Sequence, residues 1–368
     1  MAQSPPNTGP SRTAPPMSAR VRADRPDAPS RPARGRGADR AERAARDLRR
    51  LLLVTFAVPV VGSAIDFAAL SGAPVRGWSD AVLPWLRLAC SAATGWWLAR
   101  LTSPRSARPA ARPALRTWAV LLCAVVAVGA RVADLVRVGE TQSAVGSLAT
   151  TVLLAWLCGE LAVRHGAGPR GLGIDPPGAR TLAGRLTAVM VFGAVFVVAY
   201  TTVAWMAHLQ LTLPEVAPAL PVLDRAQGAA LGWSGPVDMV ANVLFTGVAE
   251  EMVLVGAVLV LGRAAGRPLW ALCALGLLLR VAAHLYLGAP GVALVLLGSC
   301  ALLLYLRHGR LTPLVVGHVV YDLAAYWAPS TAALNTWAFA VLLVGGTAFA
   351  AWLAWCAPAA GAGSGHGR

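Results

Sequence analysis

The sequence is poor in charged residues and contains no lysine. Only 13% of its 368 residues are charged and 57% are hydrophobic, whereas about a quarter of the residues in a soluble domain are charged. This composition excludes an ordinary soluble protein. All 32 basic residues are arginine, so the glycine-rich stretch 166–173 lacks the lysine of a P-loop, and phosphate binding of that kind is not expected there.

Paired cysteines are also absent. The six cysteines lie in apolar segments without paired spacing, which indicates small buried hydrophobic residues rather than disulfides or zinc ligands. They are Cys90, Cys123, Cys158, Cys273, Cys300 and Cys356.

The first 50 residues have no apolar run, so no signal peptide is predicted there. They hold 12 arginines, five acidic residues and many Pro, Ala, Gly and Ser. Such a segment cannot bury enough apolar surface to fold alone. We expect residues 1–50 to be a disordered cytoplasmic tail that touches anionic lipids and does not bind nucleic acid.

What the sequence does have is a series of long apolar runs, which are typical of membrane helices. The expected fold class is an all-α, polytopic transmembrane helix bundle of about ten spans. The predicted spans are 51–70, 81–100, 117–136, 144–163, 186–208, 237–262, 269–288, 290–306, 311–328 and 332–356. The predicted divisions are the tail 1–50, four accessory helices in 51–163, a Gly/Pro/Arg-rich cytoplasmic linker 164–185, a six-helix core in 186–356 and a flexible end 357–368.

The arginines give these spans an orientation. With the N-terminus inside, 26 of the 32 arginines fall in cytoplasmic segments and only Arg76, Arg137 and Arg225 fall outside. This split follows the positive-inside rule and predicts that both termini are cytoplasmic. An arginine-only, alanine-rich chain is typical of a high-GC bacterial product, so the inner membrane is the expected location.

Ionisable side chains at bilayer depth are costly, and each is a functional hypothesis. They gather in the last third of the chain, on three predicted spans: Glu250 and Glu251, His284, and His318 with Asp322. His318 and Asp322 are four residues apart and therefore share one helix face. A carboxylate near imidazoles in a dry cavity can activate a water molecule, and a further donor can stabilise an oxyanion.

These residues resemble three motifs of the CAAX protease and bacteriocin-processing (CPBP) family. Glu250-Glu251 and the five residues that follow resemble its EExxxR motif. Ala283-His284 resembles the end of FxxxH, and the run from His318 to Asp322 resembles a motif of His followed at the fourth position by Asn. The resemblance covers about residues 180–330, which includes most of the predicted core.

The resemblance implies an intramembrane, glutamate-dependent endopeptidase that acts on a membrane-anchored protein or peptide. Glu250 would activate water with His284, while His318 and Asp322 would bind the developing oxyanion. Glu251 would hold the site together through its partners. This scheme requires no metal and no organic cofactor.

The sequence departs from the motifs at three positions. The arginine of the first motif is replaced by Val255, and the phenylalanine of the second by Arg280. We hypothesise that Arg280 supplies the lost guanidinium from the neighbouring helix and pairs with Glu251, since two adjacent glutamates at this depth need a counter-charge. Asp322 stands where the family has a neutral donor, so it would either carry a proton or orient His318.

Three alternatives remain open from the residues alone. The same acids and histidines form a chemically possible nitrogen–oxygen metal site, although no HExxH motif is present. A catalytically inactive relative that binds a membrane partner or acts in immunity would also carry degenerate motifs. A proton- or ion-coupled transporter would use buried acids as well.

Overall fold

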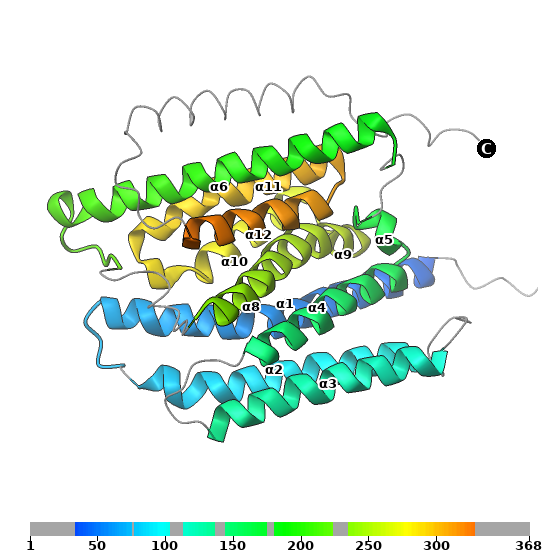
Figure 1. Ribbon diagram of the computed structural model, residues 1–368. Helices are drawn as coiled ribbons and strands as arrows, with labels where there is room; N and C mark the ends of the chain where they lie inside the picture. The colour runs from blue at the N-terminus through cyan, green and yellow to red at the C-terminus, as the bar shows by residue number, and fades with distance from the viewer. Residues whose placement is uncertain are drawn as a thin grey trace, which may run out of the picture.

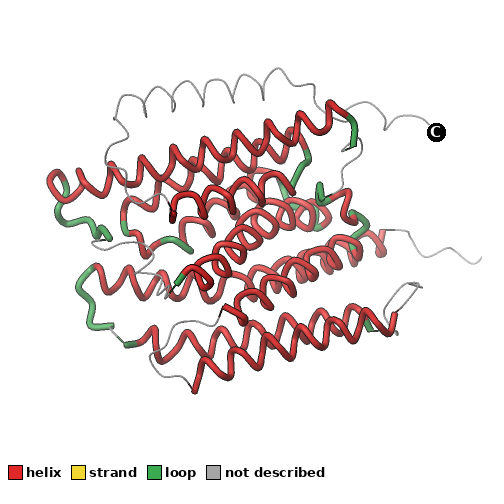
Figure 2. Tube along the Cα trace, viewed as in Figure 1, coloured by secondary structure: helices red, strands yellow, loops and turns green. Residues whose placement is uncertain are grey.

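The computed structural model describes residues 34–75, 77–103, 113–136, 144–174, 180–223 and 235–327. Within these ranges the chain is helical, as expected, and forms no strand (Figure 2). An isolated antiparallel bridge joins Val222 to Gly288. The predicted tenth span, 332–356, and the flexible end, 357–368, lie outside the described residues.

The helices follow one another in a simple order. Their bounds are α1 (Arg34–Leu70), α2 (Trp78–Thr102), α3 (Pro113–Val136), α4 (Ala144–Arg164), the short α5 (Gly168–Gly171), α6 (Leu182–Val216), α8 (Pro236–Gly247), the π-helix η1 (Val248–Ala257), α9 (Val258–Ala264), α10 (Leu269–Ala282), the 3₁₀ turns η2 (Leu285–Leu287) and η3 (Ala289–Ala293), α11 (Leu294–His308) and α12 (Thr312–Trp327).

Six of the described helices are long and apolar enough to cross a membrane. They are α1, α3, α4, α6, the continuous helix Pro236–Ala264 and the segment Ala289–His308. The expected count of ten is not confirmed. At 14 and 16 residues, α10 and α12 are shorter than the roughly 20 residues that a span needs. The six apolar helices are consistent with a multi-pass membrane protein.

The predicted span 269–288 is wrong at its C-terminal end. The α-helix ends at Ala282, and the backbone then turns through η2 and η3. Gly288 adopts a positive φ of 72°, and the Ala289 amide donates to the Pro221 carbonyl at 2.8 Å. The residues that follow α6 therefore accept a hydrogen bond from a backbone amide of this turn. In a continuous helix this amide would have bonded to a carbonyl of the same helix.

Helix α1 begins at Arg34, inside the segment that we expected to be a disordered tail. Charged residues of this stretch have partners: Arg46 pairs with Glu42 at 2.8 Å, and buried Asp47 lies 2.9 Å from His165 Nε2. The contact with His165 joins α1 to the end of α4. Together the two contacts explain how the charged stretch can form the N-terminal part of α1. Residues 1–33 lie outside the description.

The helices pack in successive layers (Figure 1). Helices α2 and α3 pack together at one side, and α1 and α4 lie next to them. The continuous helix α8–η1–α9 follows, and α10, α11 and α12 separate it from much of α6. The π-helix thus lies in the interior of the described bundle.

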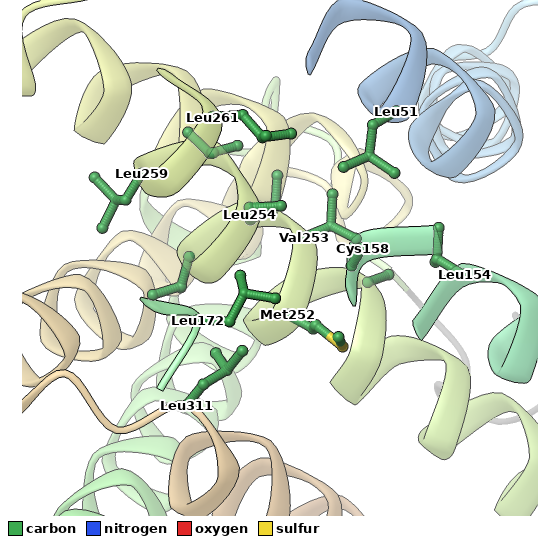
Figure 3. Close-up of a cluster of buried hydrophobic side chains, with 14 of the residues drawn as sticks. Leu51, Leu154, Cys158, Leu172, Met252, Val253, Leu254, Leu259, Leu261 and Leu311 are labelled. Atoms are coloured by element: carbon green, nitrogen blue, oxygen red, sulfur yellow. The ribbon is translucent and has the colours of Figure 1, made fainter. Parts of the chain in front are cut away.

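The main apolar core surrounds η1 and α9. Leu51 of α1 and Leu154 and Cys158 of α4 lie against Met252, Val253 and Leu254, while Leu172 and Leu311 approach from another side (Figure 3). All these side chains are buried. The helices that precede the predicted core therefore supply part of the wall around the glutamates.

Candidate active site

The two glutamates lie in a π-helical segment. Between Val248 and Ala257 the chain forms a π-helix, and residues 249–257 are all buried. A π-helix bonds each amide to the carbonyl five residues earlier and is frequently found at functional sites. Its wider turn reduces the angle between successive side chains relative to an α-helix, so Glu250 and Glu251 approach the same neighbour.

Glu251 is the centre of a buried polar cluster. Its side chain is fully inaccessible to solvent. Its Oε1 accepts a hydrogen bond from Arg280 Nη2 at 2.7 Å and one from His318 Nδ1 at 2.8 Å. One carboxylate oxygen thus links α10 and α12 to η1. These contacts are compatible with the organising role that the motif resemblance implies, and that role stays a prediction.

Glu250 faces His284. Its Oε1 lies 3.4 Å from His284 Nε2, and its Oε2 lies 3.4 Å from Arg280 Nε. On the other side of the imidazole, His284 Nδ1 lies 2.8 Å from the Arg280 carbonyl oxygen. A carbonyl only accepts hydrogen bonds, so Nδ1 donates and the neutral ring keeps a lone pair on Nε2. With the ring in that neutral form, two acceptor atoms face each other, which would suit a water molecule that donates to both.

His318 lies between two carboxylates. Its Nδ1 contacts Glu251, and its Nε2 lies 3.4 Å from Asp322 Oδ2. His318 is buried, whereas 28% of the Asp322 side chain is exposed. The ring donates to both acids only as an imidazolium. Of the two roles that the sequence left open for Asp322, orienting His318 is the one that this geometry supports.

Arg280 is the cation that the two glutamates share. It is 1% exposed, and in addition to its contacts with both carboxylates its Nη2 donates to the Glu250 carbonyl at 3.3 Å. The ion pair expected between Arg280 and Glu251 is thus present. Val255 and Arg280 line one small packing gap between η1, α10 and α11, so the motif position and the observed arginine are neighbours in space.

Gly298 of α11 makes room for this arginine. A Cβ at position 298 would lie 3.2 Å from Arg280 Cδ and 2.7 Å from Leu277 Cδ2. Any larger residue would press on the aliphatic part of the Arg280 side chain. The buried arginine therefore depends on a close approach of α10 and α11.

Ser63 of α1 fixes the backbone beside His284. Its Oγ donates to the Ala283 carbonyl oxygen at 2.5 Å, and the side chain is buried. Sequence reasoning missed this residue, because a serine in an apolar helix usually bonds to its own backbone. The only available signal was its polarity within an otherwise apolar run.

The donor atoms of Glu250, Glu251 and His318 lie within 4.8 Å of one another, close enough to hold a metal ion. The observed contacts argue against that use. The Arg280 guanidinium already lies against both carboxylates, and His318 directs Nδ1 at Glu251 rather than outward. A divalent cation would have to displace a buried arginine, so the donor set does not fit a metal.

The structure therefore brings all six predicted site residues into one connected cluster. Glu250 and Glu251 come from η1, Arg280 from α10, His284 from the turn that follows it, and His318 with Asp322 from α12. The proximity of these residues is observed, while the catalytic role of each remains a prediction.

Comparison with known proteins agrees with the motifs. No curated protein and no solved structure matches the chain. Residues 232–324 match a family model described as type II CAAX prenyl endopeptidase Rce1-like. That range contains all three motifs and every residue of the cluster. The chain is a multi-pass membrane protein whose residues 232–324 are similar to the Rce1-like CAAX protease family.

Proposed function

We propose that this protein is an intramembrane endopeptidase of the bacterial inner membrane that hydrolyses a peptide bond in a membrane-anchored protein or peptide. The observation that carries the proposal is the pairing of Glu250 Oε1 with His284 Nε2 at 3.4 Å, with the other imidazole nitrogen fixed on a backbone carbonyl. This pairing supports general-base catalysis, because a base must lie within hydrogen-bond reach of the water whose proton it takes.

In this scheme a water molecule donates its hydrogens to Glu250 Oε1 and His284 Nε2. Glu250 takes one proton while the water oxygen attacks the carbonyl carbon of the substrate. The carbonyl π electrons move onto oxygen and give a tetrahedral oxyanion. The proton then passes to the amide nitrogen, the carbon–nitrogen bond breaks, and the products are a carboxylate and an amine.

His318 is the proposed donor to the oxyanion. Its Nδ1 is held by Glu251, so the oxyanion would share the Nε2 proton with Asp322. Asp322, 3.4 Å from that nitrogen, orients the ring and keeps a proton on it. A cationic donor that is already oriented stabilises the charge that develops in the transition state.

The test is hydrolysis of a membrane-anchored peptide by the purified full chain in water enriched in ¹⁸O, with hydroxylamine present. Direct attack by water predicts one ¹⁸O atom in the new carboxylate and no hydroxamate. A hydroxamate product would reveal an acyl-enzyme and contradict the scheme. Failure to cleave any peptide would instead support a non-catalytic protein.

A non-catalytic relative that binds a membrane partner or acts in immunity is the second candidate. The observation in its favour is Val255, which replaces the arginine of the first motif with a buried apolar side chain. The non-catalytic candidate and the proposed peptidase can be distinguished by measuring how strongly the protein binds its partner. Binding of the partner would be unchanged in a variant that lacks the proposed base.

We predict that Ser63→Ala will weaken catalysis without abolishing it. The change leaves the buried Ala283 carbonyl without its donor, at a cost of about 1 kcal/mol or slightly more, and loosens the turn that carries His284. We expect a roughly five-fold lower kcat/KM for a membrane-anchored peptide. Ser71→Ala is the matched control, because Ser71 is exposed and bonds only locally, to the Phe67 carbonyl at 2.9 Å. Equal rates for the two variants would contradict the assigned role.

A further inference from the structure

An open groove lies on the outside of the bundle, away from the glutamates. It has a volume of about 410 Å³ and is formed by the start of α6, the start of α12 and the loop at Gly173 and Ile174. Most of its wall is apolar, and two arginines line it. The residues that carry the argument are Arg185, Val189, Phe192, Arg310 and Val316.

Arg310 is the unusual member of this wall. It lies between α11 and α12, is only 9% exposed, and makes no hydrogen bond or ion pair with any residue that the structure describes. A buried charge is costly unless it is paired and hydrogen-bonded. Within the described residues, the groove therefore presents a nearly buried guanidinium without an anionic partner, which favours an anionic ligand.

The surroundings of Arg310 add further positive potential. Arg185 lies in the first turn of α6, and Thr312 and Pro313 form the first turn of α12, so the N-termini of two helices flank the groove. Unsatisfied amide groups and the helix dipole make such ends favourable for anions. Two helix ends and two arginines favour one anionic group at this end of the groove.

The polar end of the groove is held in place by backbone contacts. The Leu311 amide donates to the Gly173 carbonyl at 3.0 Å, and Thr312 Oγ1 donates to the Ile174 carbonyl at 3.2 Å. Gly173 has a φ of 75°, and a Cβ there would lie 2.2 Å from the Gly309 carbonyl oxygen. The loop and the start of α12 thus form one rigid edge around Arg310.

The rest of the groove faces outward. Val189 is 66% exposed and Val316 is 44% exposed, and α6 is long and apolar enough to cross a membrane. In a bilayer such side chains contact lipid tails. We propose that the groove binds one anionic phospholipid, with its phosphate on Arg310 and Arg185 and an acyl chain along Val189, Phe192 and Val316.

This site is independent of the proposed peptidase activity, because the residues that line the groove include none of the six residues of the catalytic cluster. It is also distinct from any contact between lipid and the N-terminal arginines. Its ligand is recognised by the combination of a headgroup with net negative charge and a hydrocarbon chain. A free anion lacks the chain, and a zwitterionic lipid lacks the net charge.

The test measures lipid retained by the purified full chain in native mass spectrometry, with added phosphatidylglycerol, phosphatidylcholine or inorganic phosphate. We expect wild type to retain phosphatidylglycerol in preference to phosphatidylcholine. Arg310→Gln removes a charge-assisted contact and should lower this retention about ten-fold. Arg267→Gln, which changes an exposed arginine outside the groove, should leave it unchanged.

A second variant, Val316→Trp, keeps both arginines and fills the apolar part of the groove, so it should also lower retention even if Arg310→Gln fails to fold. Equal retention by Arg310→Gln and Arg267→Gln would overturn the proposal. Displacement of the lipid by inorganic phosphate would show a simple anion site instead. Displacement by a peptide with a free C-terminal carboxylate would assign the groove to a peptide and would also overturn it.

Discussion

Glu250→Gln will reduce hydrolysis of a membrane-anchored peptide by about 1,000-fold. Loss of a general base typically costs between about 100-fold and 10,000-fold in rate, and glutamine keeps the shape of the side chain while losing the ability to take a proton. Because Glu250 makes only long contacts, at 3.4 Å, with Arg280 and His284, the fold should tolerate the change. We expect kcat to fall while the thermal unfolding temperature stays close to that of wild type.

Glu215→Gln provides the matched control for this substitution. Glu215 is an exposed glutamate near the end of α6 and should show wild-type kinetics. If Glu250→Gln cleaved the peptide at the wild-type rate, the glutamate mechanism would be wrong whatever the behaviour of the other variants. If neither wild type nor variant cleaved but both bound the same partner, the non-catalytic candidate would replace it.

Arg280→Leu will destabilise the protein strongly and eliminate its activity. The change leaves Glu251 buried with His318 as its only cationic contact among the described residues. Breaking a buried ion pair by removing one partner costs about 3–5 kcal/mol. We expect the unfolding temperature in detergent to fall by roughly 10 °C. The exposed Arg267 provides the control, and Arg267→Leu should leave the unfolding temperature unchanged.

The double variant Arg280→Leu with Val255→Arg tests whether the guanidinium has moved between helices. Val255 and Arg280 line the same gap, so an arginine at position 255 has a route to Glu251. We expect partial recovery of both the unfolding temperature and the activity. Recovery should be incomplete, because Arg280 contacts both glutamates from its own helix. If Arg280→Leu alone were silent in both measurements, the idea of an exchanged arginine would fail.

The residues of the cluster could be predicted because ionisable residues are easily recognised within long apolar runs of the sequence. Glu250, Glu251, His284, His318 and Asp322 stand out in apolar runs, and a side chain of this kind at bilayer depth needs a partner. The same reasoning identified Arg280 as the counter-charge of Glu251. The all-α class followed from the long apolar runs, because a membrane interior requires backbone groups to be satisfied within each segment.

The geometry of the cluster could not be predicted, because it depends on departures from regular helices. Nothing in the residues around Glu250 distinguishes a π-helix from an α-helix. The end of α10 at Ala282 depends on the contact between Gly288 and the chain near Pro221. Ser63 is 220 residues from the carbonyl that it holds, and nothing in the residues around Arg310 indicates that this arginine is buried.

The packing of Leu51, Leu154 and Cys158 against the π-helix has a consequence for how similarity to the family should be interpreted. The matched segment, residues 232–324, is the part of the chain that is similar to the family. Residues outside this segment contribute to the apolar core around it. Leu51 and Leu154 are almost completely inaccessible to solvent, and both belong to helices outside the match. The segment that matches the family and the set of helices that form the core around η1 therefore have different boundaries. In this protein the residues of the proposed site come from one stretch of chain, whereas the buried environment around them is assembled partly from helices outside the family match.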